Sequence, residues 1–111
     1  MYYNEQILFS TPDSLRSNYR IPSVITTKHG TTLAFCNDRI DTRIDHADEA
    51  HLVVRRKERG GDWEDEIRLF AQPGWSCYIG AAVYDAETDE IMCFFTRNGV
   101  VMVELDRKSV V

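Results

Sequence analysis

Hydrophobic and polar residues alternate over short stretches along this chain, a period typical of β-strands rather than helices. The β-branched residues that crowd Ile21–Thr27 favour extended backbone. Lys28-His29-Gly30 then predicts a turn into a second strand, Thr31–Cys36, and therefore a hairpin. After a brief apolar run at Gln6–Phe9, further strands are predicted at Leu52–Arg56, Glu66–Ala71, Ile79–Tyr84, Ile91–Phe95 and Val100–Val103. The fold class is therefore predicted to be all-β.

One long charged segment, Asn37–Glu49, interrupts this pattern. It is too polar for a core and long for a connection between neighbouring strands. Long loops on a rigid scaffold often carry function, so this segment is predicted to be a functional loop.

The pattern restarts after Gln72-Pro73-Gly74. Val24 and Val83 are separated by 83 − 24 = 59 positions, and the same offset relates Phe35 to Phe94 and Gly30 to Asp89. Four strands followed by a restart predict antiparallel β-propeller blades, with blade 1 at about 20–71 and a second blade beginning at about 78–105. The alternative is that two hairpins of similar length align by chance.

Composition narrows the possible partners. The chain has 111 residues, enough for one small domain, and a net charge of −5 that argues against nucleic-acid or anionic membrane surfaces. No run approaches membrane-spanning length, and the start lacks a signal peptide, which favours a cytoplasmic location. Cys36, Cys77 and Cys93 lack metal-ligand spacing, and Cys36 and Cys93 are predicted to be buried thiols.

The stretch Arg20-Ile21-Pro22 carries candidate chemistry. Pro22 has no N–H for a sheet ladder, so it belongs in the first residues of a strand or at a sheet edge. This places Arg20 at a strand entrance, where its side chain could line a cleft. A guanidinium matches a carboxylate through two parallel hydrogen bonds, which makes Arg20 a candidate anion clamp. A solvated surface arginine is the common alternative.

Several segments in order resemble the opening of the exo-α-sialidases (neuraminidases). The similar segments are Tyr19-Arg20-Ile21-Pro22, the hairpin at Gly30, Leu33-Ala34-Phe35, Leu52-Val53-Val54-Arg55-Arg56, Gly60-Gly61-Asp62-Trp63 and Val83–Thr88. Gly60–Trp63 is similar to the tail of the Asp-box (BNR repeat), although Lys57-Glu58-Arg59 replaces its usual Ser-x-Asp portion. The resemblance covers residues 19 to 96.

The resemblance implies a fold, a substrate and residue roles. The family forms a six-bladed propeller, of which this chain would hold about two blades, and it releases sialic acid from sialylated glycans without metal or cofactor. Arg20 matches the first arginine of the triad that binds the sugar carboxylate. Arg39, with Arg43 as a neighbouring candidate, matches an arginine near the C4 hydroxyl. Asp45 matches the loop aspartate that acts as general acid and base, with Asp41 and Asp48 as alternatives.

The chain also departs from the family pattern. The nucleophilic tyrosine, its glutamate partner and two triad arginines come from later blades and match nothing here. Tyr19, Tyr78 and Tyr84 are interpreted as packing residues, and the apolar Ile79–Ala82 differs from the usual polar start of the second blade. We interpret the chain as the N-terminal portion of a sialidase, inactive alone. Two alternatives are a non-catalytic sugar-binding or interaction module and an independent small β domain.

Overall fold

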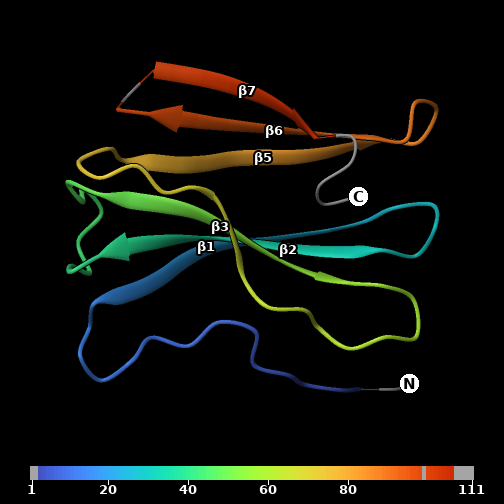
Figure 1. The fold of residues 1–111 in the computed structure, drawn as a ribbon, viewed down its shortest axis with the longest axis horizontal. Helices are drawn as coiled ribbons and strands as arrows, with labels where there is room; N and C mark the ends of the chain where they lie inside the picture. The colour runs from blue at the N-terminus through green and yellow to red at the C-terminus, as the bar shows by residue number, and fades with distance from the viewer. Residues whose placement is uncertain (1–2, 99, 107–111) are drawn as a thin grey trace.

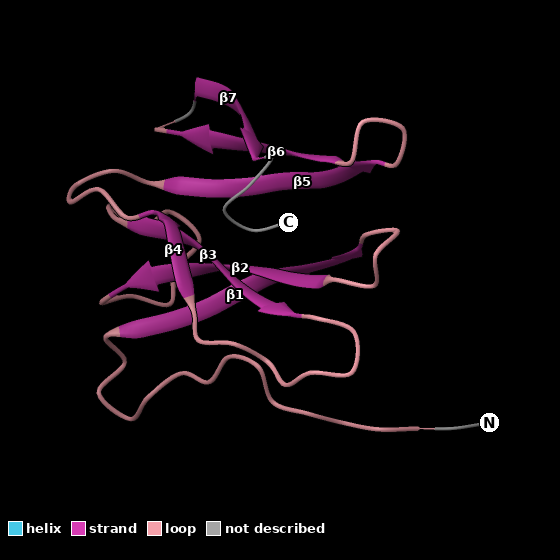
Figure 2. Ribbon diagram, turned by 45° about the vertical axis from the view of Figure 1, so that its right-hand side comes forward, coloured by secondary structure: helices cyan, strands magenta, loops and turns pink. Residues whose placement is uncertain are grey.

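Two antiparallel sheets contain every named strand in the described part of the chain. The computed structural model describes residues 3–98 and 100–106, and it places β1-β2-β3-β4 in one sheet and β5-β6-β7 in the other (Figure 1). The strands are β1 (Ser17–Thr26), β2 (Thr32–Ile40), β3 (Ala50–Lys57), β4 (Ile67–Phe70), β5 (Cys77–Asp85), β6 (Glu90–Arg97) and β7 (Val100–Asp106). No described residue is helical (Figure 2). The prediction of an all-β chain is confirmed.

The boundaries differ from the prediction at three places. Gln6–Phe9 is not a strand. β2 continues to Ile40, so Asn37, Asp38 and Arg39 lie in a strand and are buried instead of forming a loop. β1 begins at Ser17, so Arg20 lies inside the strand and not at its entrance. Pro22 lies on an edge strand, as expected. It belongs to a bulge between Arg20 and Ser23, so the ladder does not require the N–H that proline lacks.

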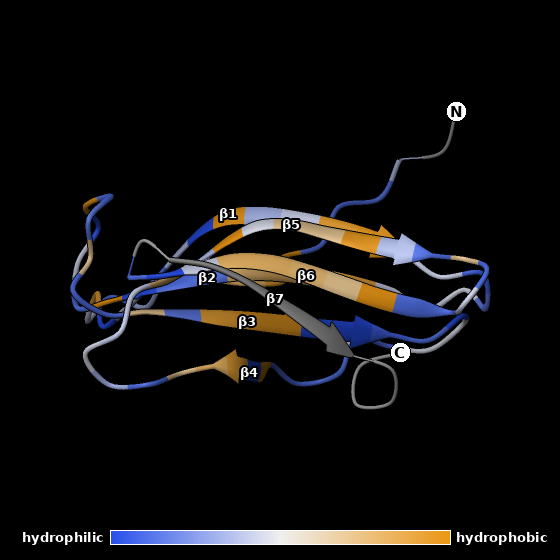
Figure 3. Cartoon of the chain, turned by 90° about the horizontal axis from the view of Figure 1, so that it is seen from above, coloured by the Kyte–Doolittle hydropathy of each residue, from blue (hydrophilic) through white to orange (hydrophobic). Residues whose placement is uncertain are grey.

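The two sheets pack face to face around an apolar core. In Figure 3 the second sheet is seen over the first, with β5 over β1 and β6 over β2, and in Figure 1 the arrowheads of β2 and β6 point the same way. Strand β5 contacts β1, β2 and β3. The core between the sheets contains Leu33, Phe35, Leu52, Val54, Cys77, Ile79, Ile91, Cys93 and Phe95. Cys36 and Cys93 are buried, as predicted.

The N-terminal segment covers the opposite face of the first sheet. Successive strand residues alternate between faces, so Cys36 and Val53 point away from the second sheet, yet both are buried. The ring centroids of Phe9 and Tyr19 are 5.2 Å apart. Arg55 Nη1 also donates to the carbonyl oxygen of Leu8 at 2.7 Å. The first sheet is therefore a middle layer, with the second sheet on one side and this segment on the other.

The two hairpins related by the sequence offset share conformational details. Gly30 and Asp89 both have positive φ, 85° and 56° respectively. The φ of Gly30 favours glycine at this turn, and a Cβ there would also require the side chain of Arg59 to move. The first strand of each hairpin carries a bulge, one between Arg20 and Ser23 and the other between Ile79 and Ala81. The hairpins correspond in bulge and turn as well as in sequence offset.

Candidate functional site

The candidate site is built on three consecutive polar residues at the end of β2. Asn37 faces the second sheet, where its Nδ2 donates to the Cys77 carbonyl at 2.7 Å and its Oδ1 accepts from Ile79 N at 3.1 Å. β5 is an edge strand, so on the side away from β6 no neighbouring strand bonds its backbone. The amide of Asn37 takes that place for the Cys77 carbonyl and the Ile79 N–H. The amide fixes the position of the second sheet relative to β2.

Asp38 points to the opposite face and is fully buried. Its carboxylate accepts from Ser17 Oγ and from Asn18 N, each at 2.9 Å, and pairs with Arg68 Nη2 at 2.9 Å. These bonds offset the cost of burying a charge. Asp38 therefore joins β1, β2 and β4.

Tyr19 extends this network and is more than a packing residue. Its hydroxyl donates to Glu66 Oε1 at 2.8 Å, and Glu66 Oε2 pairs with Arg68 Nη2 at 2.9 Å. Burial, followed by the hydrogen bond to Glu66, raises the pKa of Tyr19 to about 12. This environment keeps the phenol neutral.

Arg39 points to the same face as Asn37 and meets Asp45. Its side chain is 3% exposed, whereas that of Asp45 is 80% exposed. Arg39 Nη1 lies 3.0 Å from Asp45 Oδ1 and donates to the carbonyl of Arg43 at 3.1 Å. Arg39 Nε is buried without a hydrogen-bond partner among the described residues. The structure thus brings Arg39 and Asp45 together and places Arg39 beneath the loop 41–49.

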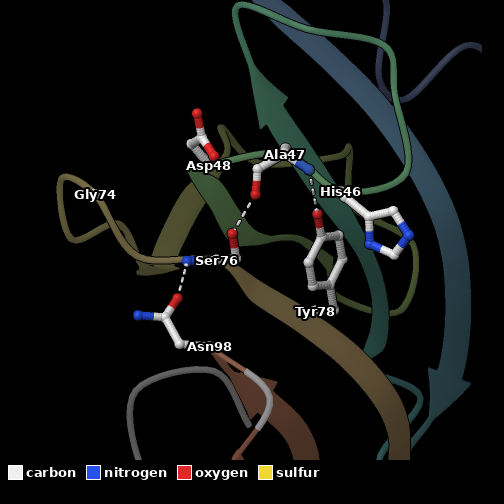
Figure 4. Close-up of a pocket in the computed structure, with 7 residues that line it drawn as sticks. All are labelled: His46, Ala47, Asp48, Gly74, Ser76, Tyr78 and Asn98. Carbon is white, nitrogen blue, oxygen red and sulfur yellow. Dashed lines mark hydrogen bonds between the residues drawn. The ribbon is translucent and has the colours of Figure 1, made fainter.

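The second sheet anchors the same loop. Tyr78 OH accepts from Ala47 N and donates to the carbonyl of Asp45, each at 2.9 Å. Ser76 Oγ also donates to the carbonyl of Ala47 (Figure 4). The backbone around Asp45 is therefore held by residues of both sheets, while its carboxyl group faces solvent. Tyr78, interpreted from sequence as a packing residue, is a loop anchor.

Arg20 is exposed and lies close to this loop. It lines a hollow of about 220 Å³ together with Arg43, Tyr19, Asn18 and Thr11. Asn18 is paired with Arg39 and Arg20 with Asn37, so Arg20 and Arg39 share a face at one end of the sheet. Ile21, which follows Arg20, has a φ of 58°, a costly conformation for a β-branched residue.

The other two loop carboxylates are placed differently. Asp41 is exposed and lies 3.8 Å from Arg16 Nη1. Asp48 is exposed and forms no hydrogen bond or ion pair with a described residue. Of the three aspartates considered from sequence, Asp45 is the one in contact with Arg39.

A second, larger hollow lies on the far side of the loop. It has a volume of about 620 Å³ and is lined by His46, Ala47, Asp48, Gly74, Ser76, Tyr78 and Asn98 (Figure 4). Asn98 Oδ1 accepts from Ser76 N at 2.8 Å, and Asn98 N donates to the Ser76 carbonyl at 2.9 Å. Sequence reasoning gave Ser76 and Asn98 no role. No local sequence pattern links Asn98 to the loop 41–49.

Within residues 3–98 and 100–106, no three His, Cys, Asp or Glu side chains are grouped to hold a metal ion, and no helix could cross a membrane. No protein-family model and no curated protein matches this chain.

Proposed function

We propose that this chain is part of a sialidase-like β-propeller that binds terminal sialic acid on glycoconjugates, with Arg20 contacting the carboxylate and Asp45 acting as general acid and base. One observation carries the proposal. Arg39 and Asp45, two residues that the resemblance names, are in contact at the end of the first sheet where Arg20 lies on the same face as Arg39.

Arg20 is suited to an anionic ligand. Its side chain is exposed, lies beside Arg43 and forms no ion pair with a described residue. Two arginines at one hollow create a local positive field within a chain of net charge −5. A sialic acid carboxylate would receive two parallel hydrogen bonds from such a guanidinium, which would also orient the sugar.

Asp45 is suited to proton transfer at a glycosidic oxygen. Its carboxyl group is exposed, and its backbone is held by Tyr78. A general acid must lie within hydrogen-bond reach of the atom it protonates, and a carboxyl group on an anchored loop meets this need. The side chain of Arg39 is buried and pairs with Asp45. In this proposal Arg39 orients Asp45 and does not contact the sugar itself.

The arrangement of the sheets supports the propeller part of the proposal. A four-stranded antiparallel sheet of sequential strands is followed by a second sheet with the same bulge and turn, stacked on its face. A propeller repeats four-stranded antiparallel sheets around a central channel, so the first sheet has the strand number and order of one blade. Because no residue here matches the nucleophilic tyrosine, we expect weak sialoside binding without hydrolysis by this chain alone.

A binding experiment tests the proposal directly. The ¹⁵N-labelled chain is titrated with the methyl α-glycoside of sialic acid and, separately, with uncharged methyl galactoside, while amide shifts are followed by NMR. We expect shifts near Arg20 and Arg43 with the sialoside. Arg20→Ala should weaken that binding at least about tenfold, because hydrogen bonds to charged groups contribute roughly 1.5–3 kcal/mol.

The matched control is Arg59→Ala, which removes another exposed arginine from the turn after β3. Its sialoside affinity should equal that of the unmodified chain. Equal losses in Arg20→Ala and Arg59→Ala would indicate binding by net charge alone. Absence of any shift with the sialoside would refute the proposed function.

A further inference from the structure

The larger hollow beside the loop 41–49 has no role in the site described so far. We propose that it binds the sugar to which the terminal sialic acid is linked. We call it the Tyr78 hollow, lined by the seven residues given above. The inference rests on the proposed function, because it assigns the second half of the same substrate.

The first argument is position. Arg43 lines the hollow of Arg20, and His46 lines the Tyr78 hollow. Asp45 lies between these two residues in the loop, and the Tyr78 hydroxyl that lines the second hollow also holds the Asp45 carbonyl at 2.9 Å. The candidate acid therefore lies between the two hollows along the chain.

The second argument is the chemistry of the reaction. A general acid donates its proton to the oxygen that joins the two sugars, so the sugars extend from Asp45 in different directions. With the carboxylated sugar in the hollow of Arg20, the second sugar would enter the Tyr78 hollow. Its volume of about 620 Å³ lies within the range of about 300–1,000 Å³ typical of ligand pockets.

The third argument is the supply of polar groups. His46 and Asp48 are exposed and form no hydrogen bond with a described residue, so both can bond sugar hydroxyls. Asn98 uses Oδ1 to hold Ser76 N, which leaves the two N–H groups of its Nδ2 as donors. Among the described residues, no lysine or arginine lines this hollow. The lining therefore favours a neutral sugar, which has both donors and acceptors, over a second anion.

Two ligands of different length test the inference. The methyl α-glycoside of sialic acid reaches one hollow, and sialyllactose, tested in both common linkages, reaches both. We expect at least one sialyllactose to bind more tightly and to shift the amides of Ala47, Ser76 and Tyr78 in addition to those near Arg20. His46→Ala should weaken sialyllactose binding about two- to tenfold, the contribution of one hydrogen bond, and leave methyl sialoside binding unchanged.

A second variant guards against a change in folding. Asn98 has a φ of 48°, a conformation that aspartate also tolerates, so Asn98→Asp keeps an oxygen that can accept from Ser76 N while removing the two N–H donors. It should also weaken sialyllactose binding selectively, whereas Arg20→Ala should weaken both ligands. If both ligands bind equally, with shifts confined to the side of Arg20, the inference is wrong and the proposed function stands. If neither ligand binds, the proposed function fails and the inference fails with it.

Discussion

Asn37, Asp38 and Arg39 are as buried as the leucines of the core, yet all three are polar. Alternation along β2 sends Asp38 to the face covered by the N-terminal segment, and Asn37 and Arg39 to the face covered by the second sheet. Each finds partners of matching chemistry there, which removes most of the cost of burial. The candidate site therefore depends on a polar interior at this end of the molecule.

The hydrogen bond between Tyr19 and Glu66 predicts a dependence of stability on alkaline pH. The pKa of Tyr19 is raised from 10.0 to about 12, mainly by burial. The folded protein therefore keeps this proton where the unfolded chain has lost it. The stabilisation is complete below pH 10 and is lost as pH rises toward 12. Urea unfolding followed from pH 8 to pH 12 measures this loss.

Tyr19→Phe is the variant that isolates this effect. Burial also raises the pKa of Cys36 to about 11 and that of Cys77 to about 12, so the unmodified chain loses stability from several groups. Tyr19→Phe should lose less stability between pH 10 and 12 than the unmodified chain does. Identical pH profiles for the two proteins would show that Tyr19 ionises normally in the folded state.

At the level of elements, the loop 41–49 is held at both sides. Arg39 donates to the Arg43 carbonyl from beneath, and Tyr78 and Ser76 bond Ala47 from the second sheet. A loop held at several backbone atoms presents its exposed side chains in a limited set of positions. This is the property that a candidate acid such as Asp45 requires.

Removing the Tyr78 hydroxyl should release this loop without unfolding the strands. In Tyr78→Phe the ring remains, but Ala47 N loses its acceptor, so its amide should exchange with deuterium about two- to tenfold faster, as expected for one hydrogen bond. Amides of Phe35 and Val54, in paired central strands, should keep their exchange rates. Faster exchange at all three positions would indicate global destabilisation and contradict a purely local role for the Tyr78 hydroxyl.

The sequence predicted the strands well because alternation and turn residues are local signals. The turn at Lys28-His29-Gly30 and the strands Ile79–Tyr84 and Ile91–Phe95 were predicted for this reason, and both hairpins form. The end of β2 was missed because the partners of Asn37 lie near Cys77, about 40 positions away. Arg39 and Asp45 were named from the resemblance, but their contact and the role of Tyr78 depend on how the loop and the sheets pack, which no local pattern records.

At the scale of the whole molecule, the N-terminal segment acts as a third layer. Phe9 is half-buried against Tyr19, and Cys36 lies buried on the same face of the sheet. Phe9→Ala should reduce the free energy of unfolding by about 1.5–2.5 kcal/mol, half the cost at a fully buried phenylalanine. It should also accelerate the reaction of Cys36 with a thiol reagent, compared in a chain with Cys77 and Cys93 replaced by alanine.

Ile7→Ala provides the control for this prediction. Ile7 belongs to the same segment but is 81% exposed, so its loss should change stability by no more than about 0.5 kcal/mol. If Phe9→Ala behaves like Ile7→Ala, the segment does not stabilise the sheet.

The amide of Asn37 has a consequence for the synthesis of the protein. Chains emerge from the ribosome beginning at the N-terminus, so β1 to β4 emerge before Cys77 and Ile79 do. During that interval the amide of Asn37, buried in the finished fold, must be satisfied by water. The first sheet can therefore form its ladder early, but its inner face stays hydrated until β5 arrives and displaces that water. The end of the first sheet that contains Asn37 is therefore completed only when β5 has emerged and packed against it.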